Sequence, residues 1–116
     1  MLAMRRKWLK ALPGVLRIYD LEIDTEVRRV KRSGRVIPLT PREYELLLLL
    51  ASQRGQVVSR TQVLSHFFAD DPDAMGRSNL VDVYIRFLRK KIDVGFWPRL
   101  ILTRRRQGYM LRGGRV

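Results

Sequence analysis

The chain has 116 residues, no cysteine, and 24 lysines and arginines against 11 acidic residues, which gives a formal net charge of +13 at pH 7. This length suits one domain with a modest core, and 46% apolar residues argue against a disordered basic tail. The lack of cysteine excludes disulfides, thiolate metal sites and cysteine nucleophiles, and the longest apolar run, 46–51, is far below the roughly 20 residues that span a membrane.

The N-terminal part of the chain is expected to form a leader followed by a small sheet. Residues 1–13 are interpreted as a linker or leader, because neither a sustained apolar core nor a small-residue cleavage site follows the basic cluster at 5–7. The domain itself is expected to span residues 14–113. Four short, partly alternating segments separated by polar turns predict an antiparallel sheet made of hairpins. These segments are Val15–Ile18, Asp20–Asp24, Val27–Val30 and Arg35–Pro38.

A helix is predicted from residue 41 onward. Thr40 has the type of an N-cap, Pro41 suits the first helical position, and Glu43 completes a capping box. Leucines on several sides of this helix indicate that it is buried between the sheet and other helices. We expect Gly55 to end it.

A second, shorter helix is predicted after Ser59, because Gln62 repeats the capping-box pattern. Residues 69–76 are polar and acidic and include a proline, so we expect a loop there. The glycine and the distal glutamate of a calcium-binding loop are missing from it. Its carboxylates are therefore expected to be solvated or to contact a partner: Asp70, Asp71 and Asp73.

A third helix is predicted over residues 78–92, with two chemically different sides. The apolar side consists of Val81, Ile85, Leu88 and Ile92, and the opposite side carries Asn79, Val83, Arg86, Phe87 and Lys90. Such a helix is anchored on one side and offers donors and positive charge on the other, as the major groove of DNA requires. The alternative is an ordinary surface helix with solvated charges. Asp82, near the helix start, is expected to orient a nearby arginine.

The chain is predicted to close with a β-hairpin. Residues 100–103 and 109–111 flank a basic turn that ends in Gly108. Two helices joined by a turn, a third helix and a hairpin match the order of a helix-turn-helix with a wing. Four aromatic residues are expected to pack in the core rather than to stack on bases: Phe67, Phe68, Trp97 and Tyr109.

The charge distribution indicates a polyanionic partner. Residues 74–116 contain eleven basic and two acidic residues, so this third of the chain carries most of the net charge. A sequence-specific binder of double-stranded DNA is the leading interpretation, and a general polyanion binder for RNA or an anionic membrane is the alternative. An enzyme is not supported, since the sequence lacks a phosphate-binding glycine loop, a carboxylate pair and a nucleophile motif, and no cofactor or metal is expected.

Several motifs, in order along residues 15–112, resemble the winged-helix DNA-binding output domain of OmpR/PhoB-type response regulators. They are Leu39–Leu47, Gly55–Arg60, Ser78–Val83 with Ile85, Leu88–Ile92, Leu100–Thr103 and Gly108–Tyr109. The resemblance implies an α+β winged helix-turn-helix with an N-terminal four-stranded antiparallel sheet, three helices and a C-terminal hairpin wing. It also implies a recognition helix in the major groove and the wing in the minor groove.

Carried over residue by residue, the resemblance places groove-reading positions at Asn79, Tyr84, Arg86, Phe87 and Arg89. Lys90 is expected to contact phosphate or solvent, and Thr103 is expected to contact phosphate. Arg105 would be the wing arginine, but its neighbours Arg104 and Arg106 are equally basic. Two departures from the family pattern are Phe87, which cannot donate a hydrogen bond, and Arg106, which stands where members usually have glycine.

The resemblance also implies partners. RNA polymerase would contact the loop at 69–76, and a second copy of the domain would bind a repeated half-site. The receiver domain of the family is not part of these residues, so the chain is expected to be an excised output domain or to belong to a regulator switched in another way. In a longer regulator, a receiver domain and a histidine kinase would be further partners. A cytoplasmic location without membrane contact is expected.

Overall fold

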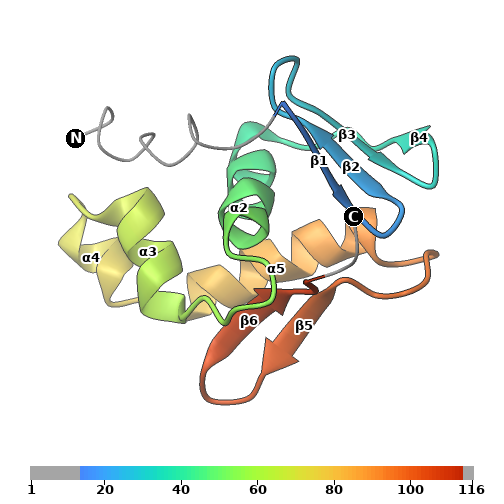
Figure 1. Ribbon diagram of the computed structural model, residues 1–116. Coiled ribbons are helices and arrows are strands. Elements are labelled where there is room, and N and C mark those ends of the chain that lie inside the picture. Colours follow the sequence, from blue (N-terminus) through green and yellow to red (C-terminus); the bar gives the residue numbers. More distant parts are fainter. Residues whose placement is uncertain (1–13, 114–116) are drawn as a thin grey trace.

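The computed structural model describes residues 14–113, so the expected leader lies outside the described residues. Four strands come first, followed by helices and a hairpin (Figure 1). The strands pair in the order β1-β2-β3-β4, each antiparallel to the next. Their bounds are β1 Val15–Ile18, β2 Leu21–Asp24, β3 Arg29–Arg32 and β4 Arg35–Val36. The predicted N-terminal sheet is confirmed.

One face of this sheet supplies part of the core, because alternate side chains of β1, β2 and β3 point to the same side. The buried residues are Leu16, Ile18, Leu21, Ile23 and Val30. β4 ends at Val36, short of the expected Pro38. The N–H of Ile37 still donates to the carbonyl of Val30 at 2.8 Å, and Pro38, which has no N–H group, cannot continue the ladder.

β3 begins two residues later than predicted, because a turn occupies residues 25–28. Asp24 Oδ1 accepts hydrogen bonds from the backbone N–H groups of Glu26 at 3.0 Å and Val27 at 3.4 Å. Arg28 adopts a positive φ of 56°, which completes the reversal. The aspartate therefore starts the turn, and Val27, expected in the strand, is exposed.

α2, Pro41–Ser52, begins as predicted. Thr40 Oγ1 accepts from the N–H of Glu43 at 3.2 Å, and the Glu43 carboxylate accepts from the N–H of Thr40 at 2.9 Å. The helix ends before Gly55, which has a φ of +82° and donates its N–H to the carbonyl of Leu111 at 2.8 Å. α2 is buried around most of its circumference and lies between the N-terminal sheet and α3 (Figure 1).

α3, Arg60–Phe68, is the predicted second helix, and its capping box is confirmed. Ser59 Oγ accepts from the N–H of Gln62 at 3.1 Å, and the Gln62 side chain accepts from the N–H of Ser59 at 2.7 Å. These two hydrogen bonds therefore fix the end of the α2–α3 link where α3 begins.

The expectation of a loop at 69–76 is wrong in part, because α4, Pro72–Met75, forms one helical turn there. Asp71 Oδ1 accepts from the N–H of Ala74 at 3.2 Å, and Pro72 occupies the first helical position, so this turn starts as α2 does. Residues 14–113 therefore hold four helices rather than the expected three.

α5, Asn79–Ile92, coincides with the predicted third helix, and its apolar side is buried: Val81, Ile85, Leu88 and Ile92. It runs beneath α2 and beside the hairpin formed by β5, Ile101–Arg104, and β6, Gly108–Leu111 (Figure 1). The predicted wing is confirmed. Within residues 14–113, no helix is long and apolar enough to cross a membrane.

The wing is also attached to the α2–α3 link. Val58 and Tyr109 form an isolated antiparallel bridge, in which the N–H of Val58 donates to the carbonyl of Tyr109 at 2.8 Å and the reverse bond measures 3.0 Å. Gly108 lies against this link, because an added Cβ would come within 2.2 Å of the Val58 carbonyl oxygen. The backbone approach therefore requires glycine at this position.

The expected core packing of aromatic residues is confirmed for three of them: Phe67, Phe68 and Tyr109. It is wrong for Trp97, which is 81% exposed. Trp97 lies in the loop between α5 and β5, where the neighbouring Phe96 is the half-buried ring, 5.2 Å from the Arg32 guanidinium. Phe96 takes the inward position, and Trp97 projects into solvent.

Candidate nucleic-acid interface

The outward side of α5 carries the chemistry of the candidate site. Four side chains expected there are exposed: Asn79, Arg86, Phe87 and Lys90. The guanidinium carbon of Arg86 lies 5.9 Å from the centroid of the Phe87 ring, so a hydrogen-bond donor and an apolar surface are neighbours. Because the opposite side of α5 is fixed in the core, these groups project from a rigid element.

A groove of about 820 Å³ runs between α5 and β5. Arg86, Phe87 and Lys90 form part of its helix side, and Leu102 and Thr103 form part of its wing side. Further wall residues, which the sequence did not single out, are Val94 and Arg99 from the connecting loop. The groove thus combines apolar walls with cationic groups.

The wing turn projects beyond this groove. Arg104, Arg105 and Arg106 are all exposed. Arg106 adopts a φ of +66°, in the left-handed region that usually favours glycine. The chain therefore keeps the turn conformation while placing a third cation in it.

Arg89, expected among the groove-reading positions, uses its donors inside the fold. Its Nη2 donates to the carbonyl oxygen of Ile101 at 3.1 Å and to Oγ1 of Thr103 at 2.7 Å. It therefore joins α5 to β5 and orients the hydroxyl group that is expected to contact phosphate. Its half-buried side chain still lines the groove.

Tyr84, another expected groove position, lies on the side of α5 that faces α2 and α3. Its ring stacks on that of Phe68, with centroids 6.4 Å apart and an interplanar angle of 20°. The guanidinium carbon of Arg42, from α2, is 5.8 Å from the Tyr84 centroid. The structure thus does not bring Tyr84 together with Arg86 in the groove.

Asp82 joins three elements. Arg60 of α3 donates from Nε to Asp82 Oδ1 at 2.9 Å, and the hydroxyl of Tyr109 in β6 donates to the same oxygen. Burial raises the pKa of the Tyr109 hydroxyl, and the bond to the Asp82 carboxylate raises it further. The predicted role of Asp82 in orienting an arginine is confirmed, and the arginine comes from α3.

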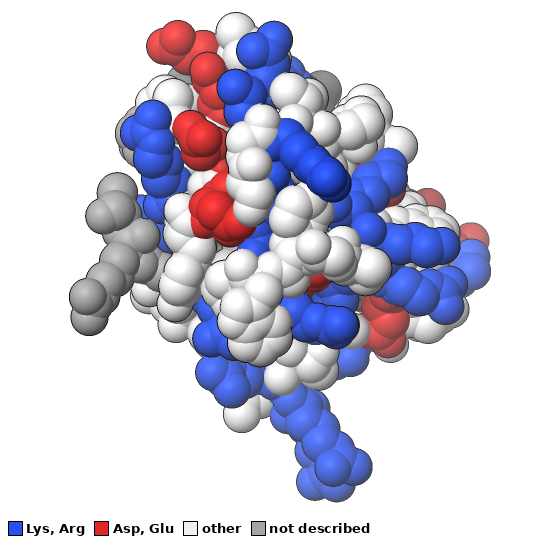
Figure 2. Space-filling view, turned by 90° about the vertical axis from the view of Figure 1, so that its right-hand side faces the viewer, with Lys and Arg blue, Asp and Glu red and all other residues white. Residues whose placement is uncertain are grey.

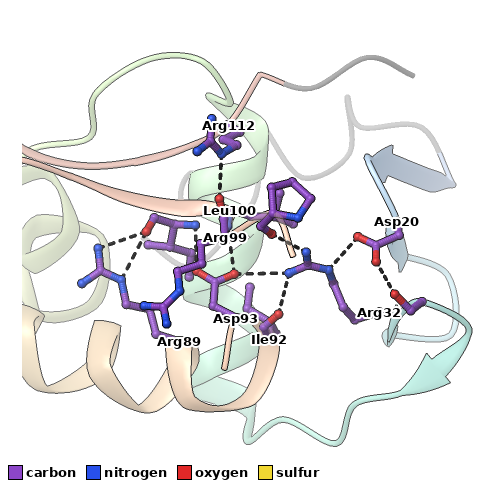
Figure 3. A network of polar contacts seen from close by, with 11 residues as sticks. Asp20, Arg32, Arg89, Ile92, Asp93, Arg99, Leu100 and Arg112 are labelled. Atoms are coloured by element: carbon purple, nitrogen blue, oxygen red, sulfur yellow. Dashed lines mark hydrogen bonds and ion pairs between the residues drawn. The ribbon is translucent and has the colours of Figure 1, made fainter. Parts of the chain in front are cut away.

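A second polar network lies inside the molecule at the other end of α5 (Figure 3). Arg32 of β3 is fully buried. Its Nε contacts Asp20 Oδ1 at 2.7 Å, and its Nη1 donates to the carbonyl of Ile92 at 2.6 Å and lies 3.3 Å from Asp93 Oδ1. Its Nη2 donates to the carbonyl of Pro98. One guanidinium therefore connects the N-terminal sheet, the end of α5 and the loop that leads to the wing.

Asp93 extends this network into β5. Its Oδ1 accepts from the N–H of Leu100 at 2.9 Å, and its Oδ2 accepts from the N–H of Ile101 at 3.0 Å. Each oxygen of the carboxylate therefore has a hydrogen-bond donor, from an arginine and two backbone N–H groups. This residue places the first strand of the wing against the C-terminal end of α5.

Glu43 ties the start of α2 to α5. Lys91 Nζ lies 2.6 Å from Glu43 Oε1. Burial by itself opposes ionisation of this carboxyl, but the hydrogen bonds from Lys91 and from the Thr40 backbone outweigh it and hold the pKa of Glu43 below its usual value.

The three aspartates of the expected polymerase-contact segment are exposed around α4. Asp70 precedes this helix, Asp71 caps it, and Asp73 lies in its first turn. Asp71 therefore has a local structural role as well. Among the described residues, no cluster of His, Asp and Glu side chains could hold a metal ion.

Basic side chains cover much of the face seen when Figure 1 is viewed from its right-hand side. Figure 2 shows Lys and Arg atoms from the upper end of this face to its lower end, at the level of the wing, and smaller groups of acidic atoms. Such a surface attracts phosphate groups and releases their counterions.

Known proteins with a similar sequence are transcriptional regulators. Residues 34–111 match the family described as "Transcriptional regulatory protein, C terminal". The chain is 40% identical over 94 residues to the uncharacterized transcriptional regulatory protein YkoG of Bacillus subtilis, which covers 81% of this chain and 40% of YkoG. It is 43% identical over 97 residues to the regulator TrcR of Mycobacterium tuberculosis, which covers 84% of this chain and 37% of TrcR. The chain spans less than half the length of these relatives.

Solved structures with the same fold include a complex with DNA. The response regulator DrrB of Thermotoga maritima, an OmpR/PhoB homologue, superposes with a TM-score of 0.77 at 33% identity, over 95% of this chain and 49% of DrrB. The DNA-binding domain of RstA from Klebsiella pneumoniae, solved with its RstA box, gives a TM-score of 0.73 at 33% identity, over 86% of this chain and 98% of that domain.

Proposed function

Since the chain belongs to the family of C-terminal domains of transcriptional regulatory proteins, the OmpR/PhoB-type DNA-binding domains, we propose that it reads a defined sequence in double-stranded DNA as the output domain of a two-component regulator. The observation that carries this proposal is the exposed side of α5, where Arg86 and Lys90 project from a helix whose other side is fixed in the core. This family is a class of transcription regulators, not of enzymes.

In the proposed complex, α5 enters the major groove and the wing reaches the adjacent minor groove. Arg86 donates two hydrogen bonds to N7 and O6 of a guanine. Lys90, Thr103 and Arg104 contact phosphates, and Arg105 enters the narrow, electronegative minor groove of an A·T-rich stretch. Asn79 at the start of α5 completes the base-reading side.

Partners other than DNA follow from the same assignment. One reading helix buries a small interface, so two copies on repeated half-sites supply useful affinity. The exposed segment with Asp70, Asp71 and Asp73 offers acidic groups to RNA polymerase. In a longer regulator, a receiver domain phosphorylated by a histidine kinase controls the domain, and the regulator acts in the cytoplasm beside the chromosome.

A competition experiment tests the proposal. A duplex selected from a random pool is bound to the protein at physiological salt and challenged with bulk genomic DNA or with RNA. We expect a preference for the selected duplex of at least about 10³-fold over bulk DNA. Equal displacement by every polyanion would instead support a general polyanion binder and would reject sequence-specific reading.

A further inference from the structure

Phe87 is an unusual residue for the side of the helix on which it lies. Its side chain is 44% exposed, although the buried stripe of α5 is complete without it. Its outward neighbours on the helix, Arg86 and Lys90, are cationic. Covering a large apolar ring that is exposed to water lowers the free energy of the system. This ring is therefore available for contact in the complex.

The position of Phe87 restricts what that partner can be. The ring lies on the helix wall of the groove between α5 and β5, and the half-buried Leu102 belongs to the wing wall. The guanidinium carbon of Arg86 is 5.9 Å from the ring centroid. Any base edge that the ring touches therefore lies within about two base steps of the base that Arg86 reads, since base pairs are stacked about 3.4 Å apart.

The chemistry of the major groove then selects the base. A phenyl ring has no hydrogen-bond donor or acceptor. Among the four bases, thymine alone presents an apolar group in this groove, its C5 methyl, while guanine, adenine and cytosine present polar atoms. Placing a phenyl ring over those polar atoms leaves them without partners.

We propose that Phe87 selects thymine in the binding site by packing on its C5 methyl group, within about two base steps of the base contacted by Arg86. This inference rests on the proposed function. The competing placement is contact with deoxyribose, which would exclude water equally well next to any base.

The test removes the methyl group rather than the side chain. In the selected duplex, each thymine is replaced singly by deoxyuridine, which keeps the hydrogen-bonding pattern. At one position the wild-type protein is expected to bind about fourfold more weakly, the change that corresponds to about 0.8 kcal/mol for one methyl group. Replacement of that thymine by 5-methylcytosine, paired with guanine, should lose less affinity than replacement by cytosine.

Two protein variants, measured on the thymine and deoxyuridine duplexes, complete the test. Phe87→Ala is expected to bind the thymine and deoxyuridine duplexes equally, while Arg86→Ala, the matched control on the adjacent position, keeps the fourfold difference. A wild-type protein that is indifferent to every deoxyuridine overturns the inference, as does a Phe87→Ala variant that keeps the full difference. If the wild-type protein selects no duplex at all, the proposed function fails instead, and the two failures are distinguishable.

Discussion

Arg32 and Asp93 are paired inside the protein, with Arg32 Nη1 3.3 Å from Asp93 Oδ1 and side-chain exposures of 0% and 4%. They are 61 residues apart in the sequence and join the N-terminal sheet to the residue that follows α5. Asp93 also accepts hydrogen bonds from the backbone N–H groups of the two residues that lead into the wing. This carboxylate therefore contributes to the orientation of both the proposed reading helix and the wing.

We expect Asp93→Ala to lower the free energy of unfolding by about 3–5 kcal/mol, because it leaves a buried cation partly unpaired and two backbone donors without an acceptor. Urea unfolding followed by circular dichroism measures the change. Arg17→Ala is the control, since its ion pair with Glu22 is exposed and measures 3.5 Å, and it should change stability by less than about 1 kcal/mol. Equal effects for the two variants would show that burial of the Arg32 pair is unimportant.

Acid should destabilise the domain through Glu43 and Asp20. Burial opposes ionisation of Asp20, but the bonds from Ser33 and Arg32 lower its pKa, as Lys91 and the Thr40 backbone do for Glu43. Carboxyl groups with lowered pKa values stabilise the fold when the pH lies above their ordinary pKa values, which are 3.8 for Asp20 and 4.5 for Glu43. This contribution disappears as the pH falls through the lowered pKa values.

The expected result is a free energy of unfolding that falls steadily below about pH 4.5. Glu43→Gln should be less stable than the wild type at pH 7 and should approach it in strong acid, because protonation removes the same charge. Chemical denaturation from pH 7 to pH 2.5 measures both curves. Parallel curves for the two proteins over this range would contradict the assignment to Glu43.

Arg86 and Lys90 are predicted to differ in kind although both are exposed cations of α5. Arg86→Ala should cost about 1–3 kcal/mol at one base position and relax the preference there. Lys90→Ala should weaken binding to all sequences alike and reduce the slope of log K against log salt by about one. Titrations on a panel of base-substituted duplexes at several salt concentrations separate the two effects; uniform weakening by Arg86→Ala would identify it as a phosphate contact.

The wing offers a test in which two neighbouring arginines are compared. Arg106→Gly should raise the free energy of unfolding by about 1 kcal/mol, because its φ of +66° strains any residue with a Cβ. Arg105→Ala should leave stability unchanged and reduce the preference for sites with A·T flanks over sites with G·C flanks. An unchanged flank preference for Arg105→Ala, together with a reduced one for Arg106→Gly, would make Arg106 the minor-groove residue.

Gly108→Ala is expected to displace the wing, because its Cβ would lie 2.2 Å from a backbone oxygen of the α2–α3 link. We predict a loss of at least tenfold in DNA affinity and a lower unfolding temperature. Gly76→Ala is the matched control, since the nearest atom to its added Cβ is 3.7 Å away and its φ is negative. A Gly108→Ala protein with native affinity would show that the wing can shift without consequence.

Local signals in the sequence were sufficient for most of the fold. The capping boxes at Thr40 and Ser59 and the apolar period of α5 are short-range patterns, and the helices that they predict are present. An aspartate before a proline, which is a different helix-start signature, marks the start of α4 at Asp71, but the polar composition of 69–76 favoured a loop. Boundaries failed where a side chain competed with the ladder, as Asp24 does before β3.

The site was predictable only in its exposed part. Periodicity identifies the outward residues of α5 but cannot tell which arginine among 24 basic residues is buried, and Arg32 gives no local sign of its long-range partners. The helical periodicity of Arg89 is that of a base-reading residue, yet its guanidinium group donates to a carbonyl oxygen of β5, a strand that begins 12 residues later. Trp97 was misplaced because hydrophobicity alone does not decide which of two adjacent rings turns inward.

The shared oxygen of Asp82 has a consequence for the DNA rather than for the protein. Because α3, α5 and β6 meet at that atom, the helix and the hairpin keep a constant separation. An operator lengthened by one base pair between the two contacted grooves would advance the second groove by about 3.4 Å and rotate it by about 35°. We therefore expect the affinity of the domain for DNA to depend on the spacing between the two contacted grooves as well as on the base sequence.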